Sequence, residues 1–202
     1  MLYHQAKQYF LNIKIIILIY EKIYSNYFVL NNLLNFRQLK EKDIKDVLEI
    51  YNYHIINGLN NFEEELISYL DFKKICNEIL YEKLPFIICL KNNQIIGFSY
   101  LTKFRNKSGY RFSFENSVYV HYDFMGMGIG NLLLKELIKS CSKNLNIKTI
   151  IAMISKNSIA SIKIHKKNDF KIMGSLKKVG FKKNKWLDVI YMQKNLFENE
   201  QN

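Results

Sequence analysis

The hydrophobic positions between residues 36 and 196 follow two different periods. In some segments apolar side chains recur every three or four residues, which is typical of a helix with one buried face; in others they alternate or run together, which is typical of strands. The helical spacing occurs in residues 44–51, 70–83, 131–143 and 158–168. The strand pattern occurs near residue 36 and in residues 85–104, 111–120, 148–155 and 170–196. The predicted order is β-α-α-β-β-β-α-β-α-β-β, a mixed central sheet flanked by helices in a single α/β (α+β) domain.

Four positions within this pattern carry local predictions. Asn92 and Asn93 separate two apolar runs and predict a tight hairpin turn. Trp186 stands beside an alternating apolar run, which favours a place in the core or in a dimer contact, with a pocket wall as the alternative. We expect Asp188 to stabilise the closing turn by accepting backbone hydrogen bonds.

The first 35 residues do not continue the regular pattern. Their apolar run at residues 15–20 is far shorter than the roughly 20 residues that a membrane-spanning helix needs, so no stable membrane span is expected. The run is compatible with the core of a targeting peptide, although no small-residue cleavage site clearly follows. A targeting extension, an additional packed helix or strand, and a disordered extension all remain open. We therefore expect an extension over residues 1–35, the domain over 36–196 and a polar tail over 197–202.

The three cysteines indicate a reducing environment. Cys76, Cys89 and Cys141 are odd in number and widely spaced, and with the four histidines they form no metal-binding or redox pattern. Cys89 and Cys141 stand in apolar surroundings, so buried, reduced thiols are expected. This favours a cytoplasmic location, with organelle targeting through residues 1–35 as the alternative, and it gives no reason to expect a metal.

The chain is strongly basic, with a formal net charge of +12. A positive field attracts a phosphorylated cofactor, nucleic acid or an acidic membrane. Nucleic-acid binding would need aromatic side chains exposed beside the basic face, whereas most aromatic residues here alternate along strands, which is typical of a core. We therefore expect no nucleic-acid partner, and we interpret most lysines of residues 163–194 as a solvated surface.

A loop with three glycines at every second position joins a predicted strand to a predicted helix. Gly126, Gly128 and Gly130 lie between the strand that ends at Val120 and the helix that starts near Asn131. Unpaired amides at a helix N-terminus attract anions, and glycine lets a phosphate approach the main chain closely. The loop lacks the Lys-Ser or Lys-Thr of a Walker loop, and it differs from the dinucleotide fingerprint. By itself it predicts either a phosphate site or a flexible turn that binds nothing.

The loop MGMGIG, residues 125–130, resembles the acetyl-CoA loop of the GNAT superfamily of N-acetyltransferases, Arg/Gln-x-x-Gly-x-Gly/Ala. More narrowly, the chain resembles the phosphinothricin N-acetyltransferase family. The matching stretches are VLEIYN, NNF, FENSVYV, ASIKIH and VGFKKNKWLDV, in the family's order between Phe36 and Leu196. Two departures concern the acetyl-CoA site: Met125 replaces Arg or Gln, and Ser158 replaces Asn. Asp169 also replaces a Gly, and the order of the basic residues at positions 105 and 107 is swapped.

The resemblance implies the GNAT fold and an N-acetyltransferase that moves acetyl from acetyl-CoA to the primary amine of a small amino-acid-like substrate in a ternary complex. It also implies a homodimer. Met125 and Ser158 motivate an alternative, a catalytically impaired acyl-CoA-binding module that acts as a sensor or partner protein. Retention of Glu115 and His165 argues against that alternative.

The resemblance also assigns roles to residues. Glu115 is the expected general base, where a solvated strand carboxylate is the alternative, and His165 is the second catalytic candidate, where a packed helix histidine is the alternative. The acetyl-CoA site is expected to comprise Val118, Tyr119, Val120, Gly126, Met127, Gly128, Ile129, Gly130, Asn131 and Ser158. Val120 also carries the candidate oxyanion-binding amide. The acceptor site is expected to comprise Phe62, Arg105, Lys107 and Tyr110, although an exposed basic loop with Tyr110 in the core remains open.

Overall fold

The computed structural model of the chain describes residues 33–141 and 146–197. Most of the N-terminal extension and of the polar tail, for which the sequence makes predictions, lies outside these residues. The described strands and α-helices are β1 (Leu34–Gln38), α2 (Ile44–Asn57), α3 (Tyr69–Tyr81), β2 (Phe86–Lys91), β3 (Gln94–Lys103), β4 (Ser113–Val120), α4 (Ile129–Cys141), β5 (Thr149–Ser155), α5 (Ile159–Lys167), β6 (Lys171–Lys182) and β7 (Lys185–Asn195). Their order confirms the predicted one.

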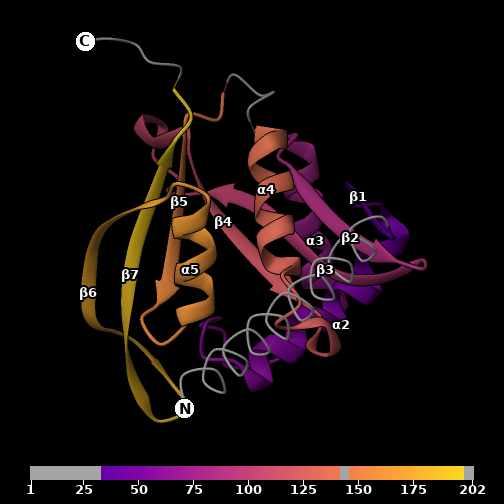
Figure 1. Cartoon of the computed structure of the whole chain (residues 1–202), viewed down its shortest axis with the longest axis horizontal. Helices are drawn as coiled ribbons and strands as arrows, with labels where there is room; N and C mark the ends of the chain where they lie inside the picture. Colours follow the sequence, from indigo (N-terminus) through magenta and orange to yellow (C-terminus); the bar gives the residue numbers. More distant parts are fainter. Residues whose placement is uncertain (1–32, 142–145, 198–202) are drawn as a thin grey trace, which may run out of the picture. The chain divides into compact units, whose positions relative to one another are not determined.

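The strands form one mixed seven-stranded sheet in the order β1-β2-β3-β4-β5-β7-β6. The β2–β3, β3–β4, β5–β7 and β6–β7 pairs are antiparallel, whereas β4 and β5 are parallel. The parallel ladder covers only Ser113–Glu115 and Thr149–Ile151. Beyond it the two strands diverge towards their carboxyl ends (Figure 1). The sheet is therefore open between the ends of β4 and β5.

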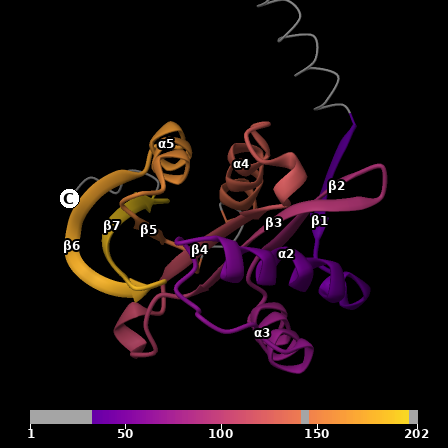
Figure 2. The ribbon, with the colours of Figure 1, turned by 90° about the horizontal axis from the view of Figure 1, so that it is seen from below.

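Helices cover both faces of the sheet. Helices α4 and α5 lie on one face, and α2 and α3 lie on the other (Figure 2). The periodic apolar side chains of α2 and α4 form much of the core, as the sequence predicted: Ile44, Val47, Leu48, Tyr51, Leu133, Leu134, Leu137 and Cys141 are all buried. None of the helices in the described part of the chain combines the length and the apolar composition needed to cross a membrane.

The three cysteines are free and buried, as predicted. Burial raises the pKa of the Cys76, Cys89 and Cys141 thiols to about 12. Because the thiolate is the reactive form, these side chains act as small apolar residues at neutral pH.

The turns follow the predicted chemistry. Asn92 and Asn93 have φ of 49° and 66°, as a two-residue hairpin turn with both central residues left-handed requires. Asp188 accepts a backbone hydrogen bond, as predicted, but the donor is the N–H of Lys178 at 3.0 Å, within β6 and away from the closing turn where the bond was expected. Lys178 itself has a φ of 51°, at an irregular step of the β6–β7 ladder. The bond from Asp188 therefore stabilises a bulge.

Strand β6 is the edge of the sheet and is exposed along residues 171–179. Trp186, on the adjoining β7, is 61% exposed, and its ring contacts that of Phe181 with centroids 5.0 Å apart. A core position for Trp186 is therefore wrong, because its ring lies with that of Phe181 on the exposed face of the hairpin. The alternative that buried Tyr110 in the core is also wrong, since Tyr110 lies in the exposed segment between β3 and β4.

Candidate active site

A cavity of about 450 Å³ opens where β4 and β5 separate. Its walls come from the carboxyl end of β4, the glycine loop with the start of α4, the first turns of α5, and the segment between α2 and α3. These segments are distant in sequence. The space left where the two parallel strands separate is the place around which they meet. All but Met127 of the residues expected to bind acetyl-CoA line this cavity.

The glycine loop enters α4 through a left-handed backbone. Gly126 and Gly128 have φ of 77° and 83°, a region that other residues adopt only with strain. The N–H groups of Asn131 and Leu132 bond to the carbonyl of Gly128 and close the first turn. Earlier amides of a helix have no partner within it, and the helix dipole adds positive charge there. The loop therefore presents donors suited to an anion.

The side chain at the first loop position contributes no such donor. Met125 is 45% exposed, and its thioether cannot donate a hydrogen bond. Lys163 of α5 is the only lysine or arginine among the residues that line the cavity, all of which belong to the described part of the chain. Ser158 also lines it, and this N-cap residue of α5 makes no side-chain capping bond. Lys163 was not singled out from the sequence, where it is one lysine among many.

The side chain of Asn131 is buried and serves packing between helices. Its Oδ1 accepts a hydrogen bond from Asn168 Nδ2 at 3.0 Å, and Asn168 Nδ2 also donates to the carbonyl of Ile164. This network joins the start of α4 to the end of α5. Because its backbone N–H is also bonded, to the carbonyl of Gly128, Asn131 shapes the start of α4 and leaves the anion to the earlier amides of the loop.

The free edge of β4 faces the cavity. The N–H of His121 donates to the carbonyl of Ile96 in β3. Because successive amides of a strand point to opposite sides, the N–H of Val120 points away from β3 and into the gap. His54 of α2 donates from Nε2 to the carbonyl of Val120 at 2.8 Å and lines the same cavity. Burial lowers the pKa of the His54 ring, which favours the neutral form of the ring. No pattern in the sequence indicated this contact, since His54 is one helix histidine with no motif around it.

Glu115 occupies the last position before the two strands separate, where it pairs with Ile151. It is half-buried, on the face of the sheet that α2 and α3 cover. Burial raises the pKa of its carboxyl group, and the positive charge of Arg105 partly opposes that effect. A carboxylate in this setting is a stronger base than an exposed one.

The residues expected at the acceptor site come from two segments. Arg105, Lys107 and Tyr110 lie in the exposed stretch between β3 and β4. Arg105 acts electrostatically on Glu115, whereas no hydrogen bond or ion pair among the described residues joins Lys107 or Tyr110 to Glu115. Phe62, between α2 and α3, packs against β6. Of the expected acceptor residues, the structure thus shows only Arg105 interacting with Glu115.

His165 is 3% exposed and bonded at both ring nitrogens. The carbonyl of Ser161 accepts from Nδ1 at 2.8 Å, which assigns the proton to that nitrogen. Nε2 therefore accepts from Nδ2 of Asn116 on β4 at 3.0 Å. Burial lowers the pKa of His165 and favours the neutral ring. The ring joins α5 to β4 below the opening between the strands.

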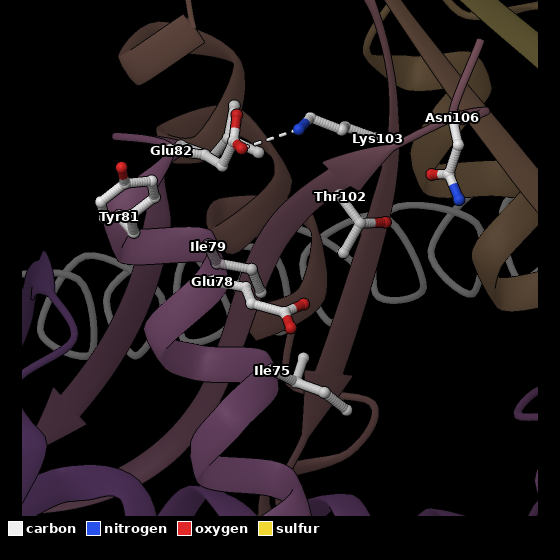
Figure 3. A pocket seen from close by; sticks show the side chains of 9 residues that line it. Ile75, Glu78, Ile79, Tyr81, Glu82, Thr102, Lys103 and Asn106 are labelled. Atoms are coloured by element: carbon white, nitrogen blue, oxygen red, sulfur yellow. Dashed lines mark hydrogen bonds and ion pairs between the residues drawn. The ribbon is translucent and has the colours of Figure 1, made fainter.

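A second pocket, of about 380 Å³, lies between the end of α3 and the end of β3 (Figure 3). Glu78 and Thr102 line it, and Glu82 forms an ion pair with Lys103 at 2.7 Å beside them. It contains none of the residues predicted from the sequence. Within residues 33–141 and 146–197, no three His, Cys, Asp or Glu side chains lie close enough together to hold a metal ion.

Comparison with known proteins agrees with this geometry. The model of the acetyltransferase (GNAT) domain family matches residues 36–191. The chain is 32% identical to phosphinothricin N-acetyltransferase of Alcaligenes faecalis, with 79% of this chain and 81% of that protein covered. It is 27% identical to the L-methionine sulfoximine/L-methionine sulfone acetyltransferase of Salmonella typhimurium, with 82% and 96% covered.

A solved structure matches as well. The GNAT superfamily phosphinothricin acetyltransferase of Sinorhizobium meliloti, in complex with acetyl-CoA, has a TM-score of 0.80 and 32% identity, with 84% of this chain and 92% of that one covered. Since the family model spans most of the sequence and these relatives share the fold over nearly their whole length, the chain belongs to the GNAT acetyltransferase family and is related to the phosphinothricin and methionine sulfoximine enzymes.

Proposed function

We propose that this acetyltransferase moves the acetyl group of acetyl-CoA to the primary amine of a small amino-acid-like substrate, within a ternary complex and with Glu115 as the general base. The observation that carries the proposal is the opening between β4 and β5, with a left-handed glycine loop at one side and a half-buried carboxylate at its inner end. The Sinorhizobium meliloti relative with the same fold was solved with acetyl-CoA, which supports the donor.

The residues of the cavity fit a phosphorylated thioester. The amides of residues 126–130 would hold the pyrophosphate, and Lys163 would supply the positive charge that Met125 lacks. The free edge of β4 at Val118–Val120 would pair with the amides of the pantetheine arm, as an added strand does. Ser158 would contribute a hydroxyl group at the start of α5. The role of acetyl-CoA is to supply an activated acyl group.

Two groups of the chain would act on the reacting atoms. Glu115 would accept the proton of the substrate ammonium group, directly or through a water molecule, because its raised pKa makes it a base suited to that task. The N–H of Val120 points into the gap and would donate to the carbonyl oxygen that gains charge. His165 has both nitrogens bonded within the fold. We therefore assign it a positioning role, which holds α5 against β4.

The acceptor is proposed from the chemistry of the exposed segment before β4. Arg105 and Lys107 suit a carboxylate or phosphinate, and Tyr110 and Phe62 suit the remainder of an amino-acid-like molecule. The names of the relatives, which mention phosphinothricin and L-methionine sulfoximine or sulfone, support this class. We also propose a homodimer through β6, because this edge strand exposes apolar residues along an unpaired backbone.

Thiol release from acetyl-CoA, measured with a panel of amines, tests the proposal. The panel contains phosphinothricin, L-methionine sulfone, L-methionine and a lysine-containing peptide. We expect release that depends on one or more of the amino acids. If acetyl-CoA binds in a calorimeter but no amine triggers release, the alternative of an impaired acyl-CoA-binding module is favoured. If acetyl-CoA does not bind to the folded chain, both ideas fail.

A further inference from the structure

A buried lysine joins the edge strand β6 to the segment between α2 and α3. Lys182 is 2% exposed, although the preceding residues 171–179 of the same strand are exposed. Its ammonium group donates to the main-chain carbonyl of Asn61 at 2.5 Å. Removing a charged group from water is costly unless it is hydrogen-bonded or paired. Glu63 and Glu64, in the same segment, supply a compensating negative charge.

Gly180, two residues before Lys182 on the same strand, allows the same segment to come close. A Cβ atom at Gly180 would lie 2.2 Å from the ring of Phe62, closer than any real contact. The ring of Phe62 therefore occupies the volume that a side chain at position 180 would need. Lys182 and Gly180 make two independent contacts with the segment of residues 58–62, which we name the bridging loop.

The bridging loop contacts β4 at its other side. Asn61 is 6% exposed, and its Nδ2 donates to the hydroxyl group of Tyr119 at 3.3 Å. Its Oδ1 accepts from the backbone N–H of Glu63 at 2.9 Å. Tyr119 packs within a cluster of aromatic rings, which includes Tyr51 and Phe98 with centroids 5.1 and 5.0 Å away. The loop thus has a rigid support at β4 and a second one at β6.

These contacts extend across the opening in the sheet. In the strand order, β5 and β7 lie between β4 and β6, so a loop bonded to residues of both β4 and β6 links two strands that are not neighbours in the sheet. Gly58, Asn60 and Asn61 also line the cavity at the separation of β4 and β5. The position of the loop therefore decides where Phe62, the residue after Asn61, stands relative to this cavity.

We propose that Lys182 and Gly180 are positioning residues that hold the bridging loop, and with it Phe62, in the place where it binds the amine substrate. This inference rests on the proposed acetyl transfer to an amine. It adds that a strand outside the cofactor cavity sets the affinity for the acceptor. Misplacement by about 1 Å can cost roughly a hundredfold in rate. Because Phe62 is the residue of the loop that is assigned to the acceptor, we expect loss of either contact to affect the acceptor more than the donor.

Two variants test the inference, each by disturbing one of the two contacts with the bridging loop. Lys182→Met keeps the length of the side chain and removes the donor, and Gly180→Ala displaces the Phe62 ring while keeping the lysine. The controls are Lys183→Met, which removes a neighbouring exposed charge, and Gly174→Ala on the same strand, where a Cβ meets nothing within 4 Å. For all four, amide hydrogen exchange of residues 60–64 is measured, together with KM for phosphinothricin and KM for acetyl-CoA.

We expect both test variants to exchange these amides faster and to raise KM for phosphinothricin by about tenfold or more, with a much smaller change in KM for acetyl-CoA. Both controls should match the wild type. Unchanged exchange, or faster exchange with an unchanged KM for phosphinothricin, would overturn the inference. Exchange does not depend on turnover, so an inactive wild-type chain would count against the proposed function and not against the loop contacts. If Lys182→Met does not fold, Gly180→Ala still decides.

Discussion

Glu115 owes its chemistry to its surroundings more than to its residue type. It is half-buried, and burial raises the pKa of its carboxyl group while Arg105 pulls the pKa down. The carboxylate becomes a better base as its pKa rises towards the working pH, but it must still be deprotonated to act. Activity that depends on Glu115 should therefore fall as the pH drops through its raised pKa.

The first prediction concerns Glu115→Gln. The amide keeps the shape but cannot accept the proton, so kcat/KM should fall by roughly a hundred- to ten-thousandfold. The acidic limb of the pH–rate profile should disappear, and calorimetry should show unchanged acetyl-CoA affinity. Glu49→Gln, a change of the same kind at an exposed position on α2, serves as the control. Unchanged turnover in Glu115→Gln would mean that another group is the base.

His165 shows the opposite case, in which a motif residue is fully engaged by the fold. Asn116→Leu removes the donor to His165 Nε2 and leaves that buried nitrogen unpaired. The free energy of unfolding in urea should fall by about 1–3 kcal/mol, with the shape of the pH–rate profile unchanged. Asn57→Leu, the same substitution at an exposed position, is the control for the change in stability. If Asn116→Leu removed one limb of the pH–rate profile without lowering the free energy of unfolding, that result would instead indicate that His165 transfers a proton.

At the scale of elements, the site depends on two strands that stop pairing. The parallel ladder ends at Glu115 and Ile151, and each strand continues alone on that side. The free amides of β4, the glycine loop and the start of α5 then face one another across the opening. A regular ladder to the end of both strands would leave no place for a ligand.

The glycine loop provides a prediction about backbone conformation alone. A Cβ at Gly126 meets nothing within 4 Å, and the same is true at Gly174, but only Gly126 has a positive φ. Gly126→Ala should therefore lower the free energy of unfolding by about 1 kcal/mol and weaken acetyl-CoA binding, whereas Gly174→Ala should change neither. Urea unfolding and calorimetry measure the two effects. Equal behaviour of the two variants would show that the left-handed loop is not required.

At the scale of the whole molecule, two features bear on association with other molecules: the net charge of +12 and the exposed strand β6. Ile172, Met173, Leu176 and Val179 on β6 are each about half exposed or more. A monomer rarely leaves such a strand uncovered, because an unpaired edge with apolar side chains promotes association. This surface is the basis for the proposed dimer.

Val179→Lys tests that dimer. A charge at the centre of an apolar interface is costly to bury, so the variant should be monomeric where the wild type is dimeric, as measured by sedimentation velocity. Tyr81→Lys removes a more exposed aromatic ring at the end of α3 and should leave the mass unchanged. A monomeric wild-type chain at micromolar concentration would contradict the proposed dimer.

Much of the fold follows from local patterns in the sequence. Hydrophobic spacing predicted the order of strands and helices, and Asn92 with Asn93 predicted the hairpin turn. The three glycines before a helix predicted either an anion site or a flexible turn, and two of them adopt a left-handed backbone. These features depend on neighbouring residues, so the chain determines them without reference to distant contacts.

Only the tertiary structure decided which distant segments meet. Nothing in the sequence indicates that the β4–β5 ladder stops at Glu115, that His54 holds the carbonyl of Val120, or that Lys182 is the buried lysine among many exposed ones. Trp186 is exposed although its alternating surroundings favoured the core or a dimer contact, because its ring lies with that of Phe181 on the exposed face of the hairpin. Periodicity reports which side of an element is apolar, whereas strand pairing and burial depend on the elements packed against it. The sequence by itself therefore determined the elements and the family, and tertiary packing decided the shape and the electrostatics of the site.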